Sequence, residues 1–189
     1  SPLVSAQTQL LSILAGVEVA ALRAQFPNAG SIVRVMPNMA ASIGAGVSVI
    51  LSTGLNEAER QAVSALMGAL GTVEWVDSED LFHAVTALSG SGPAFVLRFL
   101  SAMAAGGEAL GLAPDQALRL AAETLKGTAA LALQSTESPE ILVEQVRSPN
   151  GTTHAGLNIL DADGQLKHLI NETLAAAATR SRELAKAAQ

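Results

Sequence analysis

The hydrophobic pattern of this chain changes near residues 77–79, and this change restricts the possible folds more than any other feature. Before it, short apolar runs alternate with amphipathic stretches. After it, every apolar segment repeats with helical spacing. We therefore predict an α/β region at residues 1–78 followed by an all-helical region at residues 79–189.

The first region has the order strand, helix, strand, strand, helix, strand. The expected strands lie at 10–15, 32–36, 47–51 and 73–76, and the expected helices at 18–26 and 56–70. Ligands of open α/β sheets bind at the carboxyl ends of strands, so the ends of the first two strands are candidates to contact a cofactor. These candidates are Ile13, Leu14, Ala15, Gly16, Met36, Pro37 and Asn38. The alternative is that they form ordinary strand-ending turns.

A dinucleotide-binding domain normally carries G-x-G-x-x-G after its first strand, and this sequence contains no such motif. The run Ser89-Gly90-Ser91-Gly92 does not replace it. It lacks the first glycine of a nucleophile elbow, and no Lys-Ser or Lys-Thr follows it as in a P-loop. We interpret it as a site of close helix packing beside a ligand pocket.

Six helices are predicted in the second region. They lie at 81–88, from Pro93 to about 110, and at 115–133, 139–146, 153–160 and 165–187. The second of these is rich in alanine and glycine, so another helix can approach it closely. The last one has an apolar stripe formed by Leu166, Leu169, Ile170, Thr173, Leu174, Ala177 and Leu184. Such a stripe is buried either within the chain or against a second copy.

A loop rich in hydroxyl groups, Ser148-Pro149-Asn150-Gly151-Thr152-Thr153, connects the fourth and fifth of these helices. Gly151 allows the backbone to approach a ligand, and the first amides of a helix have no acceptor within it. Because a helix N-terminus favours anions, we expect a small carboxylate or phosphate to bind there. The alternative is an ordinary helix start with Thr152 or Thr153 as the N-cap.

Composition excludes several classes of partner. A net charge of −6 and only 3% aromatic residues argue against binding to nucleic acid or to an anionic membrane. The absence of cysteine excludes disulfides and suits a cytoplasmic protein, and no stretch is typical of a signal peptide or a membrane span. The three histidines, His83, His154 and His168, lack metal-ligand spacing, so we predict structural or surface roles for them and no metal site.

Three blocks of sequence resemble the pyrroline-5-carboxylate reductase family, which catalyses the last step of proline biosynthesis. They are Arg34-Val35-Met36-Pro37-Asn38, Leu88-Ser89-Gly90-Ser91-Gly92-Pro93-Ala94 and the loop from Ser148 to Thr153. The family usually has glycine where this chain has Asn150. Asparagine tolerates left-handed backbone better than other non-glycine residues, so we expect the path of the loop to be unchanged.

The resemblance implies the C-terminal half of a Rossmann-type dinucleotide-binding domain followed by a helical dimerisation domain. It also implies that the chain begins partway through the Rossmann domain, so that this piece alone is expected to bind dinucleotide poorly. The partners implied are 1-pyrroline-5-carboxylate or L-proline, NADP or NAD as cofactor, and a second copy bound through the C-terminal helices, with larger rings built from dimers.

The resemblance also assigns roles to individual residues. Thr153 matches the active-site threonine, whose hydroxyl would contact the nitrogen of the substrate ring. The substrate-binding set is Ser148, Asn150, Gly151, Thr152 and Thr153. Gln145 joins the residues at the strand ends in the cofactor-binding set.

Two other classes of function are compatible with the sequence. One is a nicotinamide-dependent dehydrogenase of the 3-hydroxyacid type, which uses a lysine and an asparagine one helical turn apart. Lys126 has no asparagine at that spacing. The other is a non-catalytic helical dimerisation module.

Overall fold

The structure, a computed structural model, describes residues 3–187. These residues form two compact units. The first contains the chain up to Pro93 together with the part from Glu172 onward, and the second contains Ala94–Asn171.

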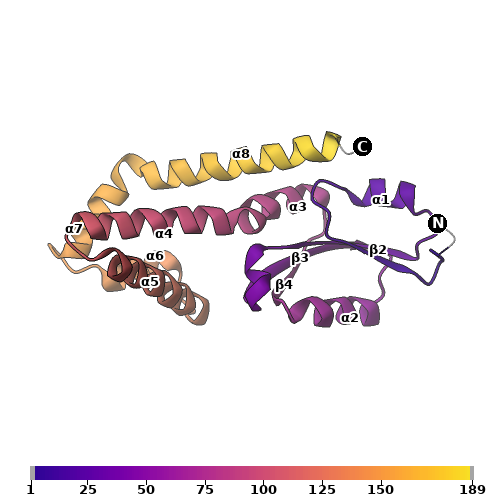
Figure 1. Ribbon diagram of the computed structural model, residues 1–189, viewed down its shortest axis with the longest axis horizontal. Helices are drawn as coiled ribbons and strands as arrows, with labels where there is room; N and C mark the ends of the chain where they lie inside the picture. Colours follow the sequence, from indigo (N-terminus) through magenta and orange to yellow (C-terminus); the bar gives the residue numbers. More distant parts are fainter. Residues whose placement is uncertain (1–2, 188–189) are drawn as a thin grey trace. The chain divides into compact units, whose positions relative to one another are not determined.

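The first unit is built on a four-stranded mixed sheet (Figure 1). Its strands are β1 (Gln9–Ser12), β2 (Ser31–Pro37), β3 (Gly46–Thr53) and β4 (Gly71–Trp75), and they lie side by side in sequence order. β1 pairs parallel with β2, β2 antiparallel with β3, and β3 parallel with β4. The predicted α/β region with four strands is confirmed.

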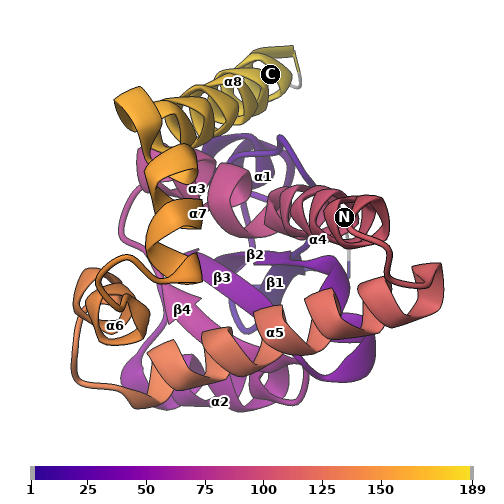
Figure 2. The same ribbon diagram turned by 90° about the vertical axis from the view of Figure 1, so that its left-hand side faces the viewer.

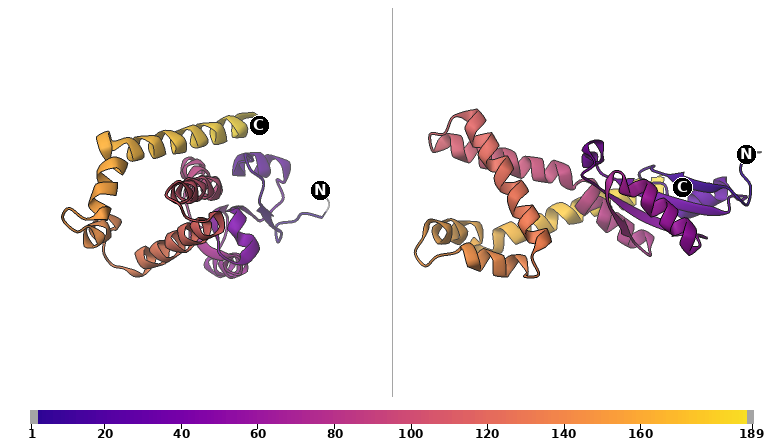
Figure 3. Two further views of the ribbon diagram at one scale, coloured as in Figure 1. Left: turned by 60° about the vertical axis from the view of Figure 1, so that its left-hand side comes forward. Right: turned by 90° about the horizontal axis from the view of Figure 1, so that it is seen from below.

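Helices cover both faces of this sheet, which explains why the central strands are almost continuously apolar. α1 (Val19–Gln25) lies on one face, where Leu22 packs with Ile32. α2 (Glu57–Gly68) lies on the other, where Val63 and Met67 pack with Val33, Val35 and Ile50. The right panel of Figure 3 views the chain from below, the side of the sheet on which Figure 1 shows α2. Successive residues of β2 thus point to opposite helical layers.

A capping box begins α2. The Asn56 side chain accepts the Glu59 amide at 3.0 Å, and the Glu59 carboxylate accepts the Asn56 amide at 2.9 Å. This exchange satisfies two amide donors at the helix start. The helix predicted at residues 56–70 is therefore confirmed, with Asn56 as its N-cap.

After the sheet, the chain remains helical for longer than the sequence suggests. α3 (Glu79–Val85) continues through the π-helical turn η2 (Thr86–Gly90) into α4 (Gly92–Ala109). The predicted break at residues 89–92 is shorter than expected, because Ser89 and Gly90 belong to η2, where the Ser91 amide bonds back to the Thr86 carbonyl at 2.8 Å, and α4 begins at Gly92. The wide turn lies just before Pro93, whose missing N–H would interrupt a regular α-helix.

The second unit consists of helices, and Figure 2 turns them toward the viewer. After α4 come α5 (Pro114–Gln134), α6 (Pro139–Val146), α7 (Thr152–Leu160), the short turn η3 (Ala162–Gly164) and α8 (Gln165–Ala187). α4 and α5 approach closely, as predicted: a Cβ added at Gly107 would lie 3.2 Å from the Cβ of Ala117. None of the helices described between residues 3 and 187 is both long and apolar enough to cross a bilayer.

Candidate functional site

A tight turn forms the loop between α6 and α7. The Gly151 amide donates to the Ser148 carbonyl at 3.0 Å, which closes a four-residue β-turn. Pro149 occupies its second position, where proline presets the backbone. Asn150 occupies the third and has a φ of 59°. A type II turn requires such a positive φ, and asparagine adopts it more readily than other non-glycine residues.

Gly151 leaves room for the Ser148 side chain. A Cβ at position 151 would overlap the Ser148 hydroxyl oxygen and lie 3.2 Å from the Ser148 carbonyl oxygen. A larger residue would therefore displace the Ser148 hydroxyl. The same contact places the Ser148 hydroxyl beside the N-terminus of α7.

The first turn of α7 is not capped by a side chain. Gly151 is the N-cap, and Ala155 is the residue whose amide bonds to its carbonyl, at 3.1 Å. The amides of Thr152, Thr153 and His154 therefore have no acceptor within the helix. The alternative that Thr152 or Thr153 serves as the N-cap is wrong. Because the Gly151 amide is already bonded within the turn, the donors for an anion begin at Thr152.

The turn after β1 is the first of the two segments expected to contact a cofactor. β1 ends at Ser12, earlier than expected, so Ile13–Gly16 lie outside the strand. Ile13 and Leu14 are exposed, at 60% and 59%. Gly16 has a φ of 75°, and a Cβ there would lie 3.4 Å from the Cβ of Leu184. A glycine fits this position because of both its backbone conformation and the neighbouring helix.

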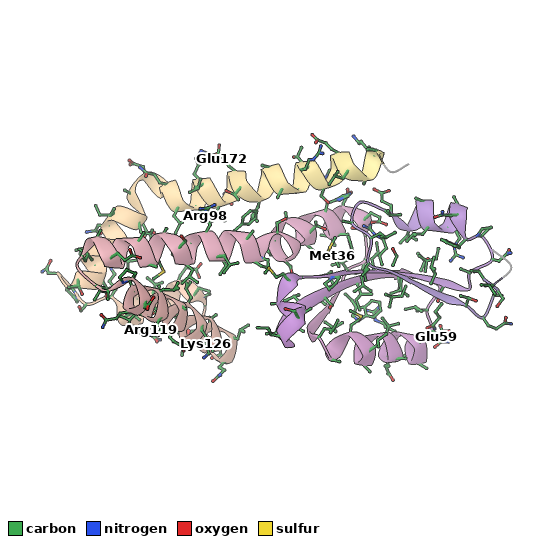
Figure 4. The ribbon with its side chains drawn as sticks, viewed as in Figure 1. Met36, Glu59, Arg98, Arg119, Lys126 and Glu172 are labelled. Atoms are coloured by element: carbon green, nitrogen blue, oxygen red, sulfur yellow. The ribbon has the colours of Figure 1, made fainter. Side chains whose placement is uncertain are left out.

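The end of β2 forms the second segment, Met36–Asn38. The Asn38 side-chain oxygen accepts the amides of Ala40 and Val47, both at 3.2 Å. These two bonds fix the orientation of the side chain and direct its amide nitrogen to the Ser89 hydroxyl, 3.5 Å away. Figure 4 shows Met36 at this end of the strand.

The Ser-Gly-Ser-Gly run and the end of β2 lie together in the first unit. Gly90 belongs to η2, and a Cβ added to it would lie 3.7 Å from the Cγ of Met36. β1 and β2 are parallel, with Ser12 opposite Arg34, so the turn at 13–16 and the segment at 36–38 share the carboxyl edge of the sheet. Both predicted cofactor-binding segments of the first unit therefore lie at the same edge of the sheet.

A buried ion pair behind this edge was missed by the sequence analysis. Arg34 is 2% exposed, pairs with the Glu79 carboxylate and stacks on Phe82, with its guanidinium 4.1 Å from the ring centre. The other oxygen of Glu79 accepts the Val19 amide at 2.7 Å. A single carboxylate therefore links β2, α3 and the start of α1. The signal that could have revealed it is an arginine inside an otherwise apolar strand.

Electrostatics in this cluster follow from burial. Desolvation lowers the pKa of Arg34 from its usual value, and the charge of Glu79 opposes this shift. His83, 4% exposed, completes the cluster, with Nδ1 2.9 Å from the Ser181 hydroxyl and Nε2 3.7 Å from the Glu18 carboxylate. These contacts connect α3 to the C-terminal part of α8 within the first unit.

Comparison with known proteins identifies the family. Residues 79–184 match the family described as "Pyrroline-5-carboxylate reductase dimerisation". The chain belongs to the pyrroline-5-carboxylate reductase family.

Individual reductases support this assignment along almost the whole chain. It is 39% identical to the reductase of Arabidopsis thaliana over 178 residues, covering 94% of this chain and 63% of that relative. It is 37% identical to the reductase of Pseudomonas aeruginosa over 187 residues, covering 98% and 68%. The chain thus spans less than two thirds of the Arabidopsis reductase.

Solved reductase structures share the fold. A pyrroline-5-carboxylate reductase from Coxiella burnetii matches with a TM-score of 0.89 at 34% identity, covering 93% of this chain and 65% of that one. The Plasmodium falciparum enzyme, solved with NADP bound, matches with a TM-score of 0.85 at 26% identity and covers 94% and 67%. The predicted resemblance and the predicted fold, a partial Rossmann-type domain followed by a helical dimerisation domain, are confirmed.

The remaining expected site residues of this reductase chain lie in the second unit. Thr153 is half-buried in the first turn of α7, Thr152 is exposed beside it, and Gln145 is exposed in the last turns of α6. Their roles in binding, together with the boundary at residues 78/79, stay predictions. Among residues 3–187, no three metal-ligating side chains come together.

Proposed function

We propose that the full-length protein reduces 1-pyrroline-5-carboxylate to L-proline, using NADPH or NADH. The observation that carries this proposal is the convergence of the Ser148 hydroxyl and the uncapped amides of Thr152 and Thr153 at the start of α7. Such a helix N-terminus favours a carboxylate. The names of the related reductases supply the substrate class.

The residues of the loop have different roles in binding the substrate. The substrate carboxylate accepts hydrogen bonds from the Ser148 hydroxyl and from the amides of Thr152 and Thr153. Asn150 and Gly151 contribute through the shape of the turn. The Thr153 hydroxyl contacts the ring nitrogen as hydrogen-bond partner or proton donor.

The cofactor-binding assignments rest on the edge of the sheet. The turn at 13–16 is exposed and the Asn38 side chain is held in one orientation, so both can contact a dinucleotide. Ile13, Leu14, Ala15, Gly16, Met36, Pro37 and Asn38 would hold it in the first unit, and Gln145 would contact it from the second. When bound, the reduced nicotinamide supplies hydride to the imine carbon.

A second copy of the chain is part of the proposal. Within the second unit, the buried residues are only Ala104, Ala117 and Ala121. Large apolar side chains on every helix of this unit remain exposed, among them Phe99, Leu120, Leu131, Ile159 and Ile170. A helical unit without a core of its own requires a partner surface, so we propose a homodimer through these helices, with larger rings assembled from dimers. We place the protein in the cytoplasm.

The test is the activity of the full-length enzyme with pyrroline carboxylate and NADPH or NADH. Thr153→Ala should lower kcat by one to about three powers of ten, because it removes a contact to the reacting ring. Thr153→Ser keeps the hydroxyl and should stay within a few-fold of wild type. Thr128→Ala, on the exposed part of α5, is the matched control. Equal turnover of wild type and Thr153→Ala would refute the role of Thr153, and an inactive wild type would refute the reaction.

A further inference from the structure

A side-chain hydrogen bond joins the residues on either side of the tight turn between α6 and α7. Arg147 Nε donates a hydrogen bond to His154 Nδ1 at 2.9 Å. Arg147 is the C-cap of α6, and His154 lies in the first turn of α7, so this bond spans the turn from Ser148 to Gly151. Figure 2 shows the two helices and the loop between them. We call this contact the Arg147–His154 clamp.

The chemistry of the clamp determines the state of the imidazole. A guanidinium nitrogen can only donate, so His154 Nδ1 must present its lone pair. The ring hydrogen then lies on Nε2, and the imidazole is neutral. An imidazolium ion donates from both nitrogens and has no lone pair for Arg147. The clamp thus requires one tautomer of His154.

Arg147 also forms hydrogen bonds with residues of α6, in addition to its bond with His154. Its Nη1 donates to the Glu144 carboxylate at 3.1 Å, and its backbone amide bonds to the Val143 carbonyl at 3.0 Å. The side chain is 33% exposed, whereas those of the ion pairs on α5 and on α8 are more than half exposed. A guanidinium with partners on both sides has little rotamer freedom. The last turn of α6 is therefore tied to the first turn of α7.

We infer that Arg147 and His154 are positioning residues that keep the substrate loop in its binding geometry. The inference rests on the proposed function, because the loop they span carries the Ser148 hydroxyl and the Thr152 and Thr153 amides. The turn itself is closed by the hydrogen bond from the Gly151 amide to the Ser148 carbonyl. Asn150 adopts a positive φ there, which is sterically less favourable for asparagine than for glycine. The clamp offsets this unfavourable free energy. Preorganised donors bind a ligand more tightly because less ordering is left for the binding step.

The first test separates binding from chemistry in the full-length enzyme. His154→Phe keeps a ring but removes the acceptor, and Arg147→Met keeps the chain length but removes the donor. Each should raise the KM for pyrroline carboxylate about tenfold with kcat within about twofold, the pattern of lost ground-state binding. His154→Gln retains an acceptor oxygen and should restore most of the KM. Arg119→Met, which removes an exposed guanidinium from α5 of the same unit (Figure 4), should change neither constant.

The second test needs no activity. In the ¹⁵N NMR spectrum of the full-length protein, His154 should show an unprotonated Nδ1 and a protonated Nε2, and Arg147→Met should abolish this preference. An inactive wild type with the expected tautomer would refute the proposed reaction and leave the clamp supported. An active wild type whose KM is unaffected by both clamp variants, or the opposite tautomer in wild type, would overturn the clamp.

Discussion

The two units of this chain bury their apolar residues in opposite ways. In the first unit, the sheet carries a full core on each face, with Ile32, Val33 and Ile50 at 0% exposure. In the second unit, the described residues bury only three alanines, and long helices present Leu, Ile, Val and Phe side chains to solvent. The difference indicates that the first unit holds much of its own stability, and it supports the proposal that the second unit is stabilised by association.

The largest expected effect comes from a charge placed on the exposed apolar surface of the second unit. Phe99 lies on α4 and is 43% exposed. In the full-length protein, Phe99→Glu should raise the dimer dissociation constant by a factor of a hundred or more, because burying an unpaired carboxylate costs at least about 3 kcal/mol. Sedimentation across a range of concentrations measures the shift. Leu66→Glu on α2, 63% exposed, is the control and should leave association unchanged. Equal dissociation constants for both variants would remove the contrast between the units.

A change to the buried ion pair probes the stability of the first unit. Glu79→Ala leaves Arg34 charged and buried, so the free energy of unfolding should fall by about 3 kcal/mol. Arg34→Met in the same background removes the orphaned charge and should recover much of the loss. Denaturant titration measures both variants. Hydrogen exchange should increase in the peptides of β2 and α1 and stay the same in those of α5. Exchange that increases equally in α5 would show that the two units unfold together.

The turn at Asn150 tests backbone strain within the second unit. Alanine lacks the side-chain hydrogen bonding that helps asparagine occupy positive φ, so Asn150→Ala should cost about 1 kcal/mol. Asn150→Gly fits the same backbone and should stay within a few tenths of a kcal/mol of wild type. Thermal unfolding of the dimer at one fixed concentration measures both. A more destabilising glycine variant would contradict a left-handed residue at this position.

The smallest effect is expected at the start of α6. A hydrogen bond from Ser138 holds the pKa of Glu140 below its usual value. A depressed pKa contributes stability above the unfolded pKa, and this contribution is lost as the pH falls through the folded pKa. Ser138→Ala should therefore raise the pKa of Glu140, as measured by carboxyl NMR titration. Ser135→Ala, whose hydroxyl accepts the Glu137 amide, should leave the pKa of Glu140 unchanged. An unchanged pKa in Ser138→Ala would refute this cause.

The elements of the fold were predictable because each one has a local cause. Apolar runs of four to eight residues marked the strands, helical spacing of apolar residues marked the helices, and α6 and α8 begin and end where the sequence predicted. The exception is residues 86–92. The π-helical turn at Thr86–Gly90 depends on the Ser91 amide pairing with the carbonyl five residues before it instead of four, and no composition signal distinguishes such a turn from a break.

The candidate site was predictable to the extent that it depends on one continuous loop. Pro149, Asn150 and Gly151 have turn preferences that follow from their own chemistry, and the structure places them in the corresponding turn positions. The clamp between Arg147 and His154 has no such local signature, since an arginine and a histidine seven positions apart contact each other only when a turn returns the chain.

The sequence by itself therefore determined the order of elements, the turn preferences of Pro149, Asn150 and Gly151, and the family to which the chain belongs. Only the tertiary structure decided that Arg34 is buried on Glu79 and Phe82, that the Val47 amide helps to orient Asn38, and that the helical unit lacks a core. Local preferences act between neighbours in the chain, whereas burial and ion pairing act between residues that only the fold brings together.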